Sequence, residues 1–228
     1  MPLNMNEVEN KQKKRIQYDP VPRGSHMARL VRVLDMGLQP RPAFDGQEKA
    51  PAYKIRLTFE LPKQRIEIDG ESRPRWIDKE ITVSTFENSN MVKYYKVLDP
   101  DNESKGDWGK LVGSECAVVV IHDQGQGKHA GKTFDKVQDI TPLMDGIECP
   151  ELENDSVTFD LSSPDMEVFE SLPEFIQNTI KSNLEFQGSK LQKLLEGQEI
   201  PVTASTEELD QEAEIAEANE PADDDQPW

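Results

Sequence analysis

Hydrophobic and polar residues alternate most clearly in residues 52–61 (AYKIRLTFEL). The apolar side chains share one face and the polar side chains share the other: Tyr53, Ile55, Leu57, Phe59 and Leu61 against Lys54, Arg56, Thr58 and Glu60. A period of two over ten residues predicts a β-strand with one buried face. Residues 66–71 extend this strand as a hairpin that turns at Asp69-Gly70.

Four other segments have the length and the Val, Ile or Leu content of strands. They are residues 27–37, 75–86, 115–122 and 133–140. Between the third and fourth strands the period changes, because Met91, Tyr94, Tyr95 and Leu98 fall at i, i+3, i+4 and i+7. This spacing predicts a helix over residues 88–98 that Asn88 or Ser89 can cap. Residues 107–113 predict a second, short helical turn.

The predicted order is therefore three strands, a helix and two strands within about 115 residues. This order favours a mainly β fold class, a five-stranded OB-fold barrel with a helix between strands 3 and 4. A small β-sandwich and an SH3-like barrel are the alternatives. The position of the helical insert favours the OB-fold.

After residue 141 the pattern changes. Residues 145–163 are acidic and loop-like, and residues 164–196 have the apolar spacing of short amphipathic helices, with Pro173 at a helix start. These helices either pack on the barrel or mediate self-association. Four regions follow from the pattern: a flexible N-terminal arm (1–26), the barrel (27–143), an acidic linker with helices (144–196) and a disordered acidic tail (197–228).

Charge is distributed unevenly along the chain. The 228 residues hold 26 Lys and Arg against 44 Asp and Glu, a formal net charge of -18. Residues 1–140 hold 23 bases and 21 acids, whereas residues 201–228 hold ten acids and no base. The isoelectric point near 4.6 therefore describes the C-terminal part. It does not exclude a nucleic-acid partner for the predicted barrel.

Several classes of protein are not expected from this sequence. No apolar run is long enough to cross a membrane, and the N-terminus lacks the apolar region of a secretory signal. Cys116 and Cys149 lack metal-ligand spacing, which favours a reducing, cytoplasmic setting without zinc or another cofactor. Asp78 and Glu80 share a strand face and could hold a metal, but no further ligand converges on them.

No enzyme motif is present either. Residues 125–133 (GQGKHAGKT) end like a phosphate-binding loop, but the first glycine is not at the required spacing and a strand follows. We therefore do not expect an enzyme. Residues 21–27 (VPRGSHM) resemble the remnant of a cleaved tag, but no polyhistidine precedes them and we treat them as native.

Basic and aromatic residues gather where an OB-fold presents its nucleic-acid groove, which is strands 2 and 3 and the loops after strands 1 and 4. Single-stranded nucleic acid needs cations along its phosphates and aromatic faces for its bases. Trp76 is the best candidate for stacking, with packing in the core as its alternative. The candidate binding residues are Arg41, Phe44, Lys54, Arg56, Arg65, Arg73, Arg75, Trp76, Lys128, His129, Lys132 and Phe134.

The last residues combine negative charge with an aromatic end. Asp223, Asp224 and Asp225 are followed by Gln226, Pro227 and the terminal Trp228. A basic pocket on a partner protein could bind such a segment. A simple acidic solubility tail is the alternative.

A predicted OB-fold followed by this tail is similar to bacterial and bacteriophage single-stranded DNA-binding proteins. Their tails end in Asp-Asp-Asp, a hydrophobic residue, Pro and Phe; here Gln226 replaces the hydrophobic residue and Trp228 replaces Phe. Residues 19–24, 28–31 and 35–39 also look like a phage-encoded protein of this type. The helical segment 164–196 is not part of the bacterial pattern.

The resemblance implies sequence-independent binding and protection of single-stranded DNA during phage replication or recombination, in the cytoplasm of an infected host. It also implies that the tail recruits replication or recombination proteins and competes with DNA for the groove. A homo-oligomer and binding of RNA remain possible within this interpretation. The alternative is an acidic interaction or scaffolding protein that binds no nucleic acid.

Overall fold

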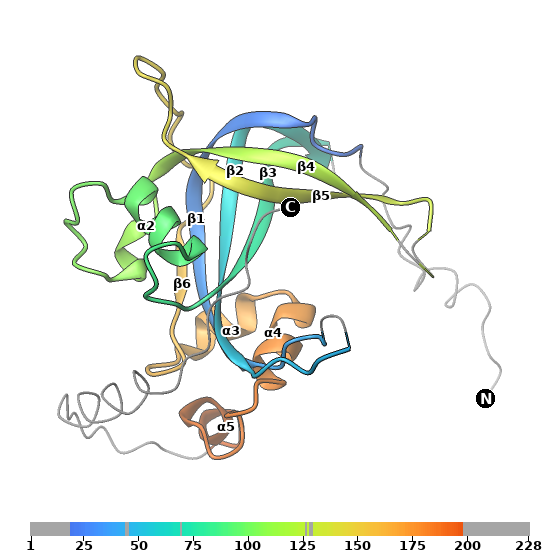
Figure 1. The fold of residues 1–228 in the computed structure, drawn as a ribbon, viewed down its shortest axis with the longest axis vertical. Coiled ribbons are helices and arrows are strands. Elements are labelled where there is room, and N and C mark those ends of the chain that lie inside the picture. The colour runs from blue at the N-terminus through green and yellow to red at the C-terminus, as the bar shows by residue number, and fades with distance from the viewer. Residues whose placement is uncertain (1–18, 44–45, 69, 126, 128–129, 198–228) are drawn as a thin grey trace.

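The chain folds around a curled antiparallel β-sheet (Figure 1). The computed structural model describes residues 19–43, 46–68, 70–125, 127 and 130–197. Five strands follow the order β3-β2-β1-β4-β5, and neighbouring strands are antiparallel. Their bounds are β1 (Gly24–Gln39), β2 (Ala52–Ile68), β3 (Glu71–Thr82), β4 (Glu115–Gln124) and β5 (Thr133–Thr141). The prediction of a mainly β fold with five strands is confirmed.

Several strand ends differ from the predictions by one to four residues, including the start of β1 and the end of β3. β1 begins at Gly24, so three residues expected in the flexible arm are paired with β4. The prediction of a third strand through residue 86 was wrong for residues 83–86. The ladder between β2 and β3 runs from Ile68↔Glu71 to Lys54↔Thr82, and β2 begins at Ala52. Residues beyond Thr82 therefore have almost no partner strand left.

Residues just before β1 are also part of the fold. Val21 is buried, and its backbone N–H donates to both carboxylate oxygens of Asp135 on β5, at 3.0 and 3.1 Å. The ring of His122 contacts the Val21 carbonyl at 2.8 Å. Residues 21–27, which look like a tag remnant in sequence, thus pair with β4 and hydrogen-bond to β5 as an integral segment.

The edges of β3 and β5 face each other across a seam that side chains bridge. Among the described residues, no backbone ladder joins these two strands. The guanidinium of Arg75 lies 3.7 Å from the Asp135 carboxylate, and the Lys79 ammonium donates to the Val137 carbonyl at 3.0 Å. The sheet is therefore a half-barrel whose two edges are held close by side chains.

Helix α2 (Asn90–Leu98) lies between β3 and β4, as the period change predicts. Ser89 caps it, because its side chain accepts from the backbone N–H of Val92. A 3-10 helix, η1 (Trp108–Leu111), follows where the short helical turn is predicted. Trp108 packs edge-on against Tyr95, with ring centroids 5.7 Å apart. Both elements cover the apolar inside of the curled sheet.

The inside of the curl holds the larger apolar cluster, which we call the inner core. The inner core contains Val21, Ala28, Leu30, Val33, Ile55, Leu57, Phe59, Leu61, Ile77, Ile81, Tyr94, Leu98, Leu111, Cys116, Val118, Val120, Val137 and Ile140. Four of the five apolar residues predicted on one face of β2 are in it. Tyr53 is not, because it lies at the start of β2, where it is exposed and donates to Glu185.

The acidic segment after β5 contains a strand that the sequence does not predict. β6 (Val157–Phe159) pairs in parallel with β1, and Arg32, Val33 and Leu34 are its partners. The expectation of loop across residues 145–163 was wrong at this point, because three residues with two apolar positions carry too little pattern. We call residues 149–161 the strap, since they run along β1.

Three short helices follow the strap and form the lower part of Figure 1. They are α3 (Met166–Ser171), α4 (Glu174–Lys181) and α5 (Lys190–Leu195), and Pro173 is the N-cap of α4. The predicted helices are therefore present. Their apolar residues pack with β1 and β6 in a second cluster, the outer core, made of Leu34, Met36, Phe159, Phe169, Leu172, Ile176, Ile180 and Leu191.

Of the two alternatives that the sequence leaves open for these helices, the structure shows packing on their own sheet. At Gly37 of β1, where φ is 69°, the helical region approaches the sheet backbone closely. A Cβ atom there would lie 2.9 Å from Cγ of Asn183 and 3.0 Å from Cδ1 of Leu161. Among the helices of the described residues, none is long and apolar enough to cross a lipid bilayer.

Candidate nucleic-acid interface

Strands β2 and β3 carry most of the candidate binding residues that the structure describes, and Lys54, Arg56 and Trp76 lie on their outer face. Directly opposite residues of an antiparallel pair share a face. The register pairs Arg56 with Glu80, Thr58 with Asp78 and Glu60 with Trp76. Cations, carboxylates and the indole ring are therefore interleaved across two adjacent strands, which fixes their contacts.

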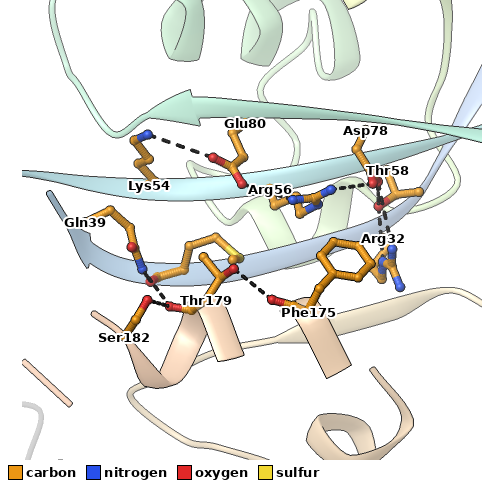
Figure 2. A network of polar contacts seen from close by, with 11 residues as sticks. Arg32, Gln39, Lys54, Arg56, Thr58, Asp78, Glu80, Phe175, Thr179 and Ser182 are labelled. Carbon is orange, nitrogen blue, oxygen red and sulfur yellow. Dashed lines mark hydrogen bonds and ion pairs between the residues drawn. The ribbon is translucent and has the colours of Figure 1, made fainter. Parts of the chain in front are cut away.

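Figure 2 shows the charged network at the centre of this face. The Arg56 guanidinium donates to Asp78 at 2.6 Å and to Glu80 at 3.0 Å, and the Lys54 ammonium lies 3.9 Å from Glu80. Asp78 and Glu80, which the sequence leaves as possible metal ligands, therefore bind cations of the chain itself. Among the described residues, no group of three or more His, Cys, Asp or Glu side chains is placed to hold a metal.

Arg32 joins the same network from the neighbouring strand β1, where it lies opposite Thr58. Its Nε–H donates to the Thr58 hydroxyl at 3.1 Å, and Thr58 donates to Asp78 at 2.6 Å. Arg32 is buried, and this burial lowers the pKa of its guanidinium despite the nearby Asp78. An arginine stays charged in proteins, so Arg32 supplies a permanent cation on the outer face.

The β2–β3 hairpin contains a hollow of about 440 Å³ at one end of this face. We call it the hairpin hollow, and its walls are Ile66, Ile68, Arg73, Pro74, Arg75, Trp76 and Asn154. Trp76 is 42% exposed, and its ring lies 5.3 Å from the guanidinium carbon of Arg32. The hollow thus combines apolar walls, two arginines and a half-exposed indole.

Glu60 fixes the Trp76 ring and the strap at the same point. Glu60 is only 1% exposed, and its carboxylate accepts from the indole N–H of Trp76 at 3.2 Å. It also accepts from the backbone N–H of Glu153 at 2.8 Å and from the Asn154 amide at 2.6 Å. Three donors satisfy a carboxylate that has almost no contact with water.

The arginines of the hairpin are each paired with a carboxylate. Arg65 donates to Glu153 of the strap, a hydrogen bond that raises the pKa of the Arg65 guanidinium. Arg73 pairs with Glu71 at 2.6 Å, and Arg75 donates to the Asp19 carbonyl at 2.6 Å besides its pair with Asp135. Together with Lys54 and Arg56, five predicted cations are thus engaged within the chain.

A second hollow, of about 320 Å³, lies at the other end of the face beside the β1–β2 loop. We call it the basic hollow, because Arg41, Lys49, Lys54 and Lys79 line it against one carboxylate, Glu80. The predicted Arg41 thus lies with Lys54, far along β3 from Trp76. Thr82 lies six positions after Trp76, which is about 20 Å of strand.

The β4–β5 hairpin carries the remaining candidates. Lys132 is exposed and Phe134 is 44% exposed. The ion pair between Arg75 and Asp135 joins this hairpin to β3. Trp76 follows Arg75 in the sequence, and Phe134 precedes Asp135. Phe44, Lys128 and His129 lie outside the described residues, as do the tail residues Asp223, Asp224, Asp225, Pro227 and Trp228.

Sequence reasoning missed three contributors to this surface. Lys49 and Lys79 line the basic hollow, although the sequence offers no reason to prefer them over other lysines. Phe175 of α4 is 58% exposed and its ring lies 5.4 Å from the Arg56 guanidinium carbon. The sequence did contain an indication of this position, because Phe175 is an apolar residue beside the buried stripe that Ile176 and Ile180 form on α4.

The two cysteines have no part in this face. Both are free and buried, and burial raises the pKa of the Cys116 thiol to about 12. A thiol with so high a pKa is a poor nucleophile and a poor metal ligand. Comparison of the chain with protein-family models, with curated proteins and with solved structures finds no match.

Proposed function

We propose that this chain binds single-stranded DNA without sequence preference along the outer face of β2 and β3. The hairpin hollow is the observation that carries the proposal. There a half-exposed Trp76 lies among apolar walls with Arg73 and Arg75 beside it. Sequence-independent binding uses this combination, since bases stack on aromatic faces while cations follow the phosphates.

We also propose that the half-barrel is an OB-fold. Three observations support this: the strand order, the position of α2 between β3 and β4, and the side-chain bridges across the seam between β3 and β5. OB-folds bind oligonucleotides on strands 2 and 3 and on the loops between strands 1 and 2 and between strands 4 and 5. The hairpin hollow and the basic hollow lie on these elements.

Internal ion pairs do not prevent such binding at the hairpin. The pairs Arg65–Glu153 and Arg73–Glu71 are exposed. Exposed pairs contribute about 0–1 kcal/mol, so a phosphate can replace the carboxylate at little cost. Arg56 differs, because it is mostly buried between Asp78 and Glu80. We therefore assign phosphate contacts to Arg65 and Arg73, and a structural role to Arg56.

The test is a titration of the full chain with a fluorescent oligo-dT of about 30 nucleotides, beside a duplex of equal length. Anisotropy at about 50 and 200 mM salt should show tight single-strand binding that salt weakens, and weak duplex binding. Trp76→Ala should lower the affinity by about 5- to 150-fold, since one stacked base contributes about 1–3 kcal/mol. Trp108→Phe is the matched control, because Trp108 packs against Tyr95 away from both hollows.

Absence of single-strand binding at the lower salt, in intact and tail-deleted chains alike, would refute the proposal. The tail-deleted chain is included because the ten acids of residues 201–228 can occupy a basic surface. We propose that this tail competes with DNA and recruits replication or recombination proteins. The similarity of residues 223–228 to the tails of phage and bacterial single-stranded DNA-binding proteins supports this part. Deleting residues 204–228 should tighten DNA binding and alter its salt dependence; equal affinity at every salt concentration would contradict competition.

A different hollow favours the alternative of an interaction protein. It has a volume of about 620 Å³, and Tyr53 and Trp108 line it together with Asp35, Asp107 and Asp160. These carboxylates would repel the phosphates of DNA, whereas they could form ion pairs with a basic side chain of a partner protein. If neither form of the chain binds single-stranded DNA, this hollow becomes the better candidate for function.

A further inference from the structure

Phe175 is an exposed aromatic residue on a helix whose neighbouring apolar residues are buried. Ile176 and Ile180 of α4 belong to the outer core, whereas Phe175 is 58% exposed. In Figure 2 the Phe175 ring lies over the sheet, beside Arg56 and Arg32. The helix therefore uses one side to attach to the sheet and presents this ring at the outer face of β1 and β2.

The position of the ring is fixed by the network beneath it. Phe175 lies 5.4 Å from the guanidinium carbon of Arg56, which is held by Asp78 at 2.6 Å and by Glu80 at 3.0 Å. The backbone of α4 is tied to β1, because the Gln39 amide donates to the Thr179 carbonyl at 3.1 Å. A ring held in this way loses little freedom when a base stacks on it.

Trp76 repeats this arrangement at the other side of the network. Its ring lies 5.3 Å from the guanidinium carbon of Arg32, and Arg32 is joined to Asp78 through Thr58 and directly at 3.8 Å. Two exposed aromatic rings thus each rest on an arginine, and both arginines converge on Asp78. Such a repeated ring-on-guanidinium arrangement is the geometry of a row of stacking positions.

We propose that Phe175 is a second base-stacking residue, so that α4 forms one side of the single-strand binding surface. The proposal rests on the binding function proposed above for the outer face. It assigns the C-terminal helices a direct role in contacting DNA, in addition to packing on β1. The strand would cross the outer face with bases on Trp76 and on Phe175, over a charged network that stays in place.

The test compares Phe175→Leu, Phe175→Trp and Leu195→Ala with the unmodified full chain. Leucine keeps the apolar bulk but has no aromatic face, and Leu195 is an exposed apolar residue of α5 outside both hollows. The readout is the dissociation constant of a labelled oligo-dT of about 30 nucleotides, measured by anisotropy over a series of salt concentrations. Circular dichroism melting verifies that each variant is folded.

We expect Phe175→Leu to raise the dissociation constant by about 5- to 150-fold at every salt concentration, with an unchanged salt slope. Phe175→Trp should stay within about threefold of the unmodified chain, and Leu195→Ala should not differ from it. A loss caused by displaced charges would instead change the salt slope, and that result would overturn the assignment.

The two proposals fail in distinguishable ways. If the unmodified chain binds oligo-dT and Phe175→Leu binds equally well, Phe175 is not a stacking residue while the binding function stands. If Phe175→Trp is as weak as Phe175→Leu, the shape of the ring rather than its aromatic face matters, and the stacking proposal is overturned. If the unmodified and tail-deleted chains both fail to bind, the binding function and this inference are refuted together.

Discussion

The inner core and the outer core share strand β1 but are built differently. The inner core collects the buried faces of the five long strands together with α2. The outer core consists of β1, the three-residue β6 and helices of six, eight and six residues. Helices this short are not stable alone, so their packing on β1 holds them. The outer core therefore depends on the sheet, whereas the inner core does not include the C-terminal helices.

The largest expected effect comes from Phe59→Ala in the inner core. Phe59 is fully buried on β2, and removing a buried phenyl ring costs about 3–5 kcal/mol of unfolding free energy. Urea unfolding followed by circular dichroism should show both cores lost together at lower urea. Phe86→Ala, at an exposed position, is the control and should change stability by less than about 0.5 kcal/mol. A loss below about 1 kcal/mol for Phe59→Ala would contradict the importance assigned to the inner core.

Ile180→Ala should destabilise the outer core while the inner core stays folded. Ile180 is fully buried in the outer core, and its truncation costs about 2–5 kcal/mol. Hydrogen exchange should become faster in α3, α4, α5 and β6 while β2 and β3 keep their protection, as expected for separate cooperative units. Leu184→Ala, at an exposed position of the same region, should leave exchange unchanged. Equal loss of protection in β2 and β3 would show that the cores are one unit.

Glu60→Ala tests the link between the strap and the hairpin. It leaves the Trp76 indole, the Glu153 amide and the Asn154 amide without their acceptor, at about 1–3 kcal/mol. Thermal unfolding should shift to lower temperature, and the Trp76 emission should change because its N–H partner is gone. Glu67→Ala, at an exposed position of the same strand, should do neither. Unchanged emission would mean that Glu60 does not hold the ring.

The smallest expected effect is a pH dependence that arises at the junction of the two cores. Burial raises the pKa of Asp35 on β1, and Asp160 and Glu185 raise it further, against hydrogen bonds from Gly37 and Leu161. Because the folded pKa lies above the unfolded value of about 3.9, ionised Asp35 costs stability, and this cost disappears as pH falls toward 4.

Asp35→Asn should therefore stabilise the chain more, relative to the unmodified protein, at pH 7 than at pH 4. Urea unfolding at the two pH values measures this difference. Asp145→Asn, at an exposed position, should show the same effect at both. If Asp35→Asn also shows the same effect at both pH values, folding does not raise the pKa of Asp35.

Much of the inner core could be predicted from the sequence, because alternation in residues 52–61 specifies which side chains face inward. A signal for the outer core was also present. Leu30-Val31 and Val33-Leu34 place apolar residues on both faces of β1, and strands covered on both faces have such runs. The sequence does not reveal what covers the second face, because β6 has only two apolar residues in an acidic segment.

The candidate site likewise has one part that the sequence predicts and one part that it does not. Arg73, Arg75 and Trp76 are close in sequence, so one hairpin brings them together as predicted. Their partners could not be predicted, because Arg65 pairs with Glu153 from 88 residues away. The position of Phe175 over Arg56 likewise depends on the path of the strap and of α4. Long-range placement decides which predicted cations are engaged within the chain.

The pairing of β6 with β1 has a consequence for the protein while it is being synthesised. Leu161 donates to Asp35 from 126 residues further along the chain, and β5, the last of the five antiparallel strands, ends at Thr141. The sheet can therefore form on the ribosome while the outward side of β1, with Leu34 and Met36, still lacks its cover. At about 5–20 residues per second, the next fifty or so residues take roughly 3–10 s to follow. In that interval a nascent chain exposes an apolar stripe and an open strand edge, the surface on which newly made copies would aggregate or a chaperone would bind. A chain ending at residue 143 is accordingly expected to self-associate more strongly than the full chain, and equal sedimentation of the two would argue against this view.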